Sequence, residues 1–254
     1  MVAWLGALAV GVTLGLLGSG GSIVTVPVLV YLLHQPEKVA IAGSLGIVGG
    51  IAAVGGMMAA VRGKVDVRSV VWFGLPGMAG TYGGAWLAGL VSGAVQLFVF
   101  AVVMLVAAAF MVRPRPRPPA GAGHRGSRVL IAAEGLAVGV LTGFVGVGGG
   151  FLIVPALVLL GGLPMHVAVG TSLAIIALKS FAGFWKYLDV LADAGLRLDW
   201  QVLVTFTIVG AVGSLAGNLV SGRIPQAHLQ RVFAIFLVVV GVFILWQSGS
   251  GLAS

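Results

Sequence analysis

Two clusters of glycine and small hydroxyl residues hold groups that could bind a ligand in this sequence. The first is Gly18, Ser19, Gly20, Gly21 and Ser22, and the second is Gly146, Gly148, Gly149 and Gly150. Each cluster interrupts an apolar stretch. A helix that starts again after such a break presents backbone N–H groups and the positive end of its dipole, and both favour an anion. Close helix packing is the alternative role for any single glycine.

Three hydroxyl residues could complete such an anion site. Ser44 and Ser172 occupy equivalent places in two similar stretches, residues 38–45 and 166–173, and Thr171 precedes Ser172. Each hydroxyl alone also fits a hydrogen bond within its own helix or to a neighbouring helix. Because Ser44 and Ser172 form a repeated pair beside the glycine clusters, we predict that they contact the anion.

Lys179 is the candidate for a full positive charge at this site. It lies deep in an apolar run, where a lysine near the centre of a membrane helix costs roughly 2.5 to 3.5 kcal/mol. A bound anion would offset that cost. The alternative is that the side chain extends to the membrane interface, which is the role we expect for Lys186 and Tyr187.

Other kinds of chemistry find no support in the sequence. The absence of cysteine excludes disulfides, thiolate metal sites and cysteine nucleophiles. The four histidines are scattered without metal-ligand spacing, and the carboxylates lie mostly in loops. The second glycine cluster follows an apolar helix and not a strand, unlike a dinucleotide-binding fingerprint. We therefore expect no catalytic residues, no metal and no cofactor.

Composition places the chain in a lipid bilayer. Hydrophobic residues make up 59% and charged residues 8%, with a mean hydropathy of +1.16, whereas soluble domains carry roughly 25% charged residues. The net charge of +8 is concentrated in short loops, which is typical of cytoplasmic loops and not of a nucleic-acid-binding surface. We predict an all-α, polytopic membrane protein with lipids, and no nucleic acid, as partners.

The apolar runs occur in two similar series. Gly18, Gly20, Gly21 and Pro27 recur 128 positions later as Gly146, Gly148, Gly149 and Pro155. The Gly80-x-x-x-Gly84 spacing, which lets helix backbones approach closely, recurs as Gly213-x-x-x-Gly217. Apart from the two broken segments, the predicted helical runs are 39–61, 69–91, 94–112, 167–188, 200–221 and 229–247. We predict a first repeat at 1–112, a basic, proline-rich cytoplasmic linker at 113–128 and a second repeat at 129–254.

The first segment of each repeat is predicted to be broken or re-entrant. Residues 23–33, which follow the first cluster, reach only about halfway across a roughly 30 Å hydrocarbon core. Three full spans plus a re-entrant pair in each repeat make the repeats inverted and place the basic loops 62–68 and 223–231 inside. Four full spans make the repeats parallel and leave 223–231 outside, so the charges favour inversion.

The chain resembles the TauE/SafE family of membrane transporters, also described as sulfite and organosulfonate exporters. The resemblance rests on residues 15–27, on Ala42-Gly-Ser-Leu45, on Lys64-Val-Asp-Val, and on their second copies at 139–155, Gly170-Thr-Ser-Leu173 and Arg197-Leu-Asp-Trp. It spans nearly the whole chain. It implies transport of sulfite, sulfoacetate or related sulfonates in a bacterial or archaeal inner membrane.

We therefore expect a secondary transporter that exports a small sulfur-containing anion by alternating access. An uptake permease for another small anion and a membrane assembly protein without transport activity are the alternatives. Protons or another coupling ion, and a second copy of the chain, are further candidate partners.

Overall fold

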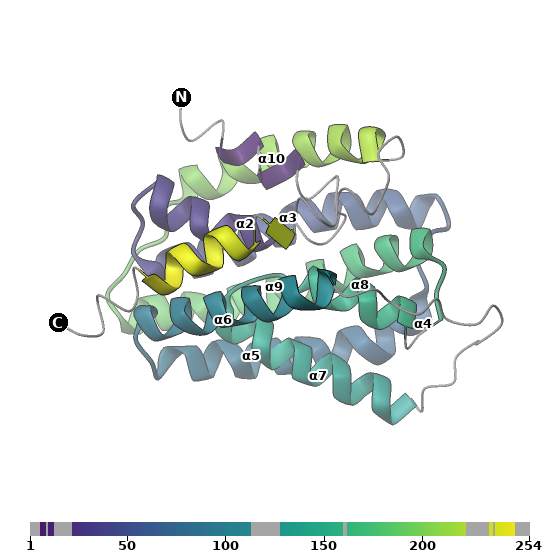
Figure 1. The fold of residues 1–254 in the computed structure, drawn as a ribbon, viewed down its shortest axis with the longest axis horizontal. Helices are drawn as coiled ribbons and strands as arrows, with labels where there is room; N and C mark the ends of the chain where they lie inside the picture. Colours follow the sequence, from purple (N-terminus) through teal and green to yellow (C-terminus); the bar gives the residue numbers. More distant parts are fainter. Residues whose placement is uncertain are drawn as a thin grey trace.

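The structure is a computed structural model, and it describes residues 6–8, 10–12, 22–112, 128–159, 162–221, 234–235 and 237–246. Every regular element in these ranges is a helix (Figure 1). This confirms the all-helical fold class. Helices suit a bilayer because they satisfy the backbone hydrogen bonds within each segment.

Where the structure describes them, the helices follow the predicted apolar runs closely, and the run at 229–247 is described only in part. Those before the linker are α2 (Ser22–Pro27), the π-helix η1 (Val28–Leu32), α3 (Glu37–Val61), α4 (Val67–Ser69), the π-helix η2 (Val70–Gly74), α5 (Leu75–Gly89) and α6 (Gly93–Val112). Those after it are α7 (Arg128–Val145), α8 (Gly150–Leu159), α9 (Met165–Asp193) and α10 (Trp200–Ser221). In the described residues, α3 and the 166–193 part of α9 are long and apolar enough to cross a membrane.

Helices α3 and α9 pack against each other in opposite directions. Gly46 near the start of α3 lies beside Phe184 near the end of α9, whereas Gly56 near the end of α3 lies beside Ala174 near the start of α9. A Cβ added at Gly56 would lie 3.1 Å from the backbone nitrogen of Ala174. The two long helices are therefore antiparallel neighbours in close contact.

Helix α5 packs in parallel against α7, with almost no space between the backbones. A Cβ added at Gly80 would collide with the carbonyl oxygen of Leu136, and one added at Gly84 would collide with that of Val140. The close approach predicted from the Gly80-x-x-x-Gly84 spacing is confirmed. Because the contacting positions rise together along the two helices, α5 and α7 run in the same direction.

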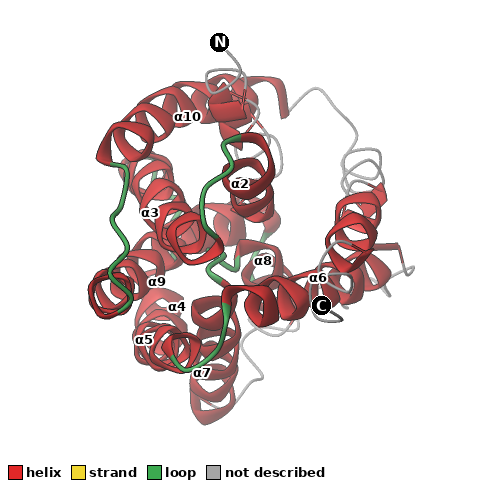
Figure 2. Cartoon of the chain, turned by 90° about the vertical axis from the view of Figure 1, so that its left-hand side faces the viewer, coloured by secondary structure: helices red, strands yellow, loops and turns green. Residues whose placement is uncertain are grey.

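Helix α10 makes a similar parallel contact with the helical residues 6–8 and 10–12. The backbone of Gly210 lies against Gly11, and a Cβ added at Gly213 would lie 3.1 Å from the nitrogen of Val12. Figure 2 shows the resulting layers, with α3 and α9 between α10 at one side and the α5–α7 pair at the other. Both close-packed pairs join a helix before the linker to a helix after it.

The loops that follow α3 and α9 are built alike. Gly63 (φ 66°) and Gly195 (φ 64°) end the two helices in the left-handed conformation, as glycine allows. An aspartate then caps the next helix: Asp66 accepts a hydrogen bond from Ser69 N, and Asp199 accepts bonds from Gln201 N and Val202 N. The loops after α3 and α9 are thus stabilised by the same two local features, a left-handed glycine and an aspartate cap.

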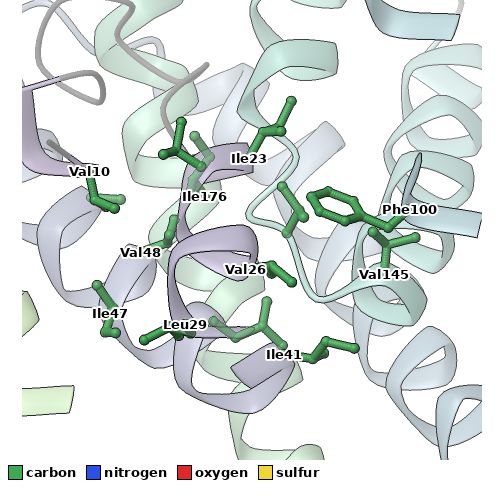
Figure 3. Close-up of a cluster of buried hydrophobic side chains, with 14 of the residues drawn as sticks. Val10, Ile23, Val26, Leu29, Ile41, Ile47, Val48, Phe100, Val145 and Ile176 are labelled. Carbon is green, nitrogen blue, oxygen red and sulfur yellow. The ribbon is translucent and has the colours of Figure 1, made fainter. Parts of the chain in front are cut away.

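Apolar side chains fill the space between α2, α3, α6 and α7. Figure 3 shows Val26 of α2, Ile41 of α3, Phe100 of α6 and Val145 of α7 meeting there, and each is at most 2% exposed. Inside a bilayer such contacts stabilise by close van der Waals packing, since lipid tails are as apolar as the side chains. This packed cluster borders the break between α7 and α8.

Candidate anion site

The second glycine cluster forms the turn that breaks α7 from α8. Gly146 and Gly149 have φ of 76° and 71°, in the left-handed region that side chains disfavour. A Cβ added at Gly148 would lie 2.7 Å from Cγ1 of Val48 in α3 and 2.9 Å from Cγ2 of Ile176 in α9. The turn therefore passes between α3 and α9 and leaves no room for side chains.

Ser44 of α3 lies at this turn. Its Oγ is within hydrogen-bonding reach of the carbonyl oxygens of Ile41, at 2.9 Å, and Gly146. The carbonyl oxygen of Thr142 accepts hydrogen bonds from Gly146 N at 2.9 Å and Val147 N at 3.1 Å. Ser44 of α3 is thus tied to the break in the other half of the chain.

Replacing Ser44 with alanine is expected to destabilise the protein by about 0.5–1.5 kcal/mol, because the hydrogen bond to Gly146 is buried and joins α3 to the turn. The matched control is Ser172→Ala, since the Ser172 hydroxyl donates only to Val169 O of its own helix, at 2.8 Å. Apparent melting temperatures of both variants in detergent check this. A larger loss for Ser172→Ala would contradict it.

Gln96 and Tyr187 hold the end of α7 in place. Gln96 Nε2 donates to the carbonyl oxygen of Phe144 at 2.8 Å and to Tyr187 Oη at 2.8 Å. Tyr187 Oη donates to the same carbonyl at 3.2 Å. Both side chains are fully buried, and they satisfy a carbonyl that the ending helix leaves without an internal partner.

Neither of these two residues was predicted for the site. The expectation that Tyr187 is an interface anchor is wrong, because its ring is fully buried. Gln96 could have been found, since it is the lone polar residue in the 94–112 run. No such signal marked Tyr187. It lies next to Lys186, which forms an exposed ion pair with Asp189 at 3.1 Å, so its polar neighbours suggested an interface position.

Lys179 is buried and does not extend to the surface. Its side chain is 1% exposed, and its Nζ lies 6.0 Å from the centroid of the Phe73 ring. A Cβ added at Gly77 of α5 would lie 3.0 Å from Lys179 Cδ and 3.2 Å from the carbonyl oxygen of Gly135 in α7. The lysine therefore occupies the junction of α5, α7 and α9.

No protein group described in the structure neutralises this lysine. Its Nζ has no hydrogen-bond partner among the described residues. All six acidic residues of the chain are in the described part, and the ion pair found there joins Asp189 to Lys186. The counter-charge for Lys179 is thus missing from the described protein.

Ser180, the next residue, faces the glycine turn. Its Oγ is buried and has no partner among the described residues. A Cβ added at Gly148 would lie 3.3 Å from this oxygen, and one at Gly49 would lie 3.2 Å from Ser180 Cβ. Consecutive residues point about 100° apart around a helix, so α9 presents a hydroxyl to the break and an ammonium to the α5–α7 pair.

The structure brings together Ser44, Gly146 and Gly148, with Ser180 added, beside Gly150 at the start of α8. It places Thr171 and Ser172 elsewhere: Thr171 Oγ1 accepts a hydrogen bond from Asp66 N at 2.8 Å, and Ser172 precedes Leu173, which packs against Gly55. Ser44 and Gly55 are 11 residues apart on α3, about 17 Å along the axis.

The structure describes only one residue of the first glycine cluster. Gly18, Ser19, Gly20 and Gly21 lie outside the described residues, and Ser22 is the first residue of α2. Their place in the site therefore stays a prediction.

The fold and composition define the class as a helical membrane protein, and comparison with known proteins gives the family. Residues 3–244 match the family model described as "Sulfite exporter TauE/SafE". A "Probable membrane transporter protein" of Xylella fastidiosa (strain Temecula1) is 31% identical over 252 residues, 96% of this chain and 94% of the relative. The "Probable membrane transporter protein YunE" of Bacillus subtilis is 25% identical over 94% of this chain and 95% of its own. No solved structure matches significantly.

The chain therefore belongs to the TauE/SafE sulfite exporter family and is a membrane transporter. This confirms the family resemblance found in the sequence motifs.

Proposed function

We propose that this transporter exports small sulfur-containing anions, such as sulfite or organosulfonates, across a bacterial or archaeal inner membrane. The observation that carries the proposal is Lys179, which is 1% exposed and without a partner in the described residues. Burying an ionised group away from water is costly unless an opposite charge or hydrogen bonds compensate it. An anionic substrate supplies that opposite charge, and the family description names sulfite as the cargo.

We further propose that the two halves are inverted repeats that exchange access to the site between the two sides of the membrane. The directions of the helices support this arrangement. Helix α3 runs antiparallel to α9, its counterpart in the second half, while α5 runs parallel to α9 and α10 runs parallel to α3. Inverted repeats commonly place a substrate site at discontinuous helices on the repeat interface. The 146–149 turn is such a break, and Ser180, the residue after Lys179, faces it.

Flux measurement tests the proposed function directly. Purified full-length protein in proteoliposomes loaded with labelled sulfite is expected to release it faster than protein-free liposomes, with saturation at high concentration. An uptake permease would carry the anion mainly in the opposite direction when reconstituted in one orientation. The absence of flux for sulfite and sulfonates would contradict the proposal and favour an assembly role.

The proposed topology predicts that the 113–128 linker is inside and that the loop after α9 is outside. The natural chain has no cysteine, so single-cysteine variants report one position each. In intact cells, cysteine at Ala194, which is exposed after α9, should react with an impermeant maleimide, whereas cysteine at Ala120 should react only after permeabilisation. Labelling of Ala120→Cys in intact cells would reverse the topology.

A further inference from the structure

We propose that the site at Lys179 selects anions with a single negative charge, so that the transported species are hydrogen sulfite and monosulfonates, and dianions are excluded. This inference rests on the proposed function. It concerns the charge of the substrate and follows from what surrounds the lysine.

The surroundings of Lys179 offer one charge and few free donors. Lys179 is the one charged side chain that is buried among the described residues. The Phe73 ring lies 6.0 Å from its Nζ, and its stem packs against Gly77. The nearby hydroxyl of Thr81 is already committed, since it donates to Gly77 O at 2.8 Å.

Charge balance then limits the substrate. A monoanion beside Lys179 makes a neutral pair. A dianion leaves one negative charge that no second buried cation among the described residues compensates, which is strongly unfavourable in a low-dielectric interior. Sulfoacetate, with a sulfonate and a carboxylate, falls in the excluded group.

A second place in the fold shows that packing does not require a lysine here. Ile51 of α3 is 128 positions before Lys179 in the sequence. It packs against Gly210 of α10, just as Lys179 packs against Gly77 of α5. Phe206 is buried near Gly210 in the sequence, as Phe73 is near Gly77, with both rings 1% exposed. An apolar side chain fills the corresponding place, so close packing at such a position does not require a charge, and we assign the charge of Lys179 to the substrate.

The test compares ethanesulfonate with ethane-1,2-disulfonate, which have the same carbon skeleton and differ by one charge. In proteoliposomes containing the wild-type protein, ethanesulfonate flux is expected to exceed disulfonate flux at least about 10-fold, since each tenfold corresponds to about 1.4 kcal/mol. In detergent, ethanesulfonate should raise the apparent melting temperature and the disulfonate should not. Lys179→Met should lose both responses, whereas Lys186→Met should keep them.

Equal flux of the two sulfonates, with both dependent on Lys179, would overturn the charge selectivity and leave the proposed function intact. Flux of neither sulfonate nor of sulfite would overturn the proposed function together with this inference.

Discussion

Replacing Gly146 with alanine is expected to abolish transport and to lower the apparent melting temperature more than replacing Gly63, a loop glycine with open space around it. Two costs add at this position. The backbone has a φ of 76°, which costs a residue with a side chain roughly 1–2 kcal/mol. A Cβ there would also collide with Ile41, so α3 would have to move away from the turn and the contact of Ser44 with Gly146 would be lost.

The matched control is Gly63→Ala. Gly63 has a similar φ of 66°, but a Cβ there would meet nothing within 4 Å. It should therefore show the backbone cost alone, about 1 kcal/mol, with transport retained. Apparent melting temperatures and sulfite flux of the two variants separate strain from collision. Equal effects at both positions would show that the contact with Ile41 is unimportant.

Lys179→Met is expected to reduce flux at least about 10-fold while leaving thermal stability unchanged or higher. Methionine has a similar length and removes a buried charge that has no partner in the described protein, and apolar replacement of buried charges is often neutral or stabilising. Loss of function together with retained stability is the result that a merely structural lysine would not give. Lys179→Arg should retain part of the flux if charge alone is required.

Lys186→Met serves as the control on the same helix. It removes an ion pair with Asp189, whose side chain is 55% exposed, and such surface pairs contribute only about 0–1 kcal/mol. Flux should be close to that of the wild type. Wild-type sulfite flux in folded Lys179→Met protein would mean that the anion binds elsewhere.

Features set by local sequence were predicted well. The run at 200–221 became α10 with the same bounds, and the run at 39–61 became α3 with two further residues at its start. Gly146 and Gly149 fell in a helix break because their left-handed backbone is accessible to glycine at low cost. Helix bounds and helix breaks depend on the residues immediately around them, so apolar run length and glycine placement were enough to predict these features.

The tertiary structure was needed to show which side chains contact one another. Ser44 reaches the 146–149 turn, whereas Thr171 and Ser172 lie toward the opposite end of the antiparallel α3–α9 pair. The hydropathy pattern could not predict this, because it does not indicate the direction in which neighbouring helices run.

The sequence by itself determined a helical membrane protein of the TauE/SafE type, with a break at the second glycine cluster and a lysine deep in an apolar helix. The tertiary structure decided that Lys179 faces α5 and α7, that Ser180 faces the turn, and that Gln96 and Tyr187 hold the end of α7. The physical reason is rotation: each residue turns about 100° around a helix axis. A side chain's partner therefore depends on how whole helices are oriented against each other, which packing between distant segments sets.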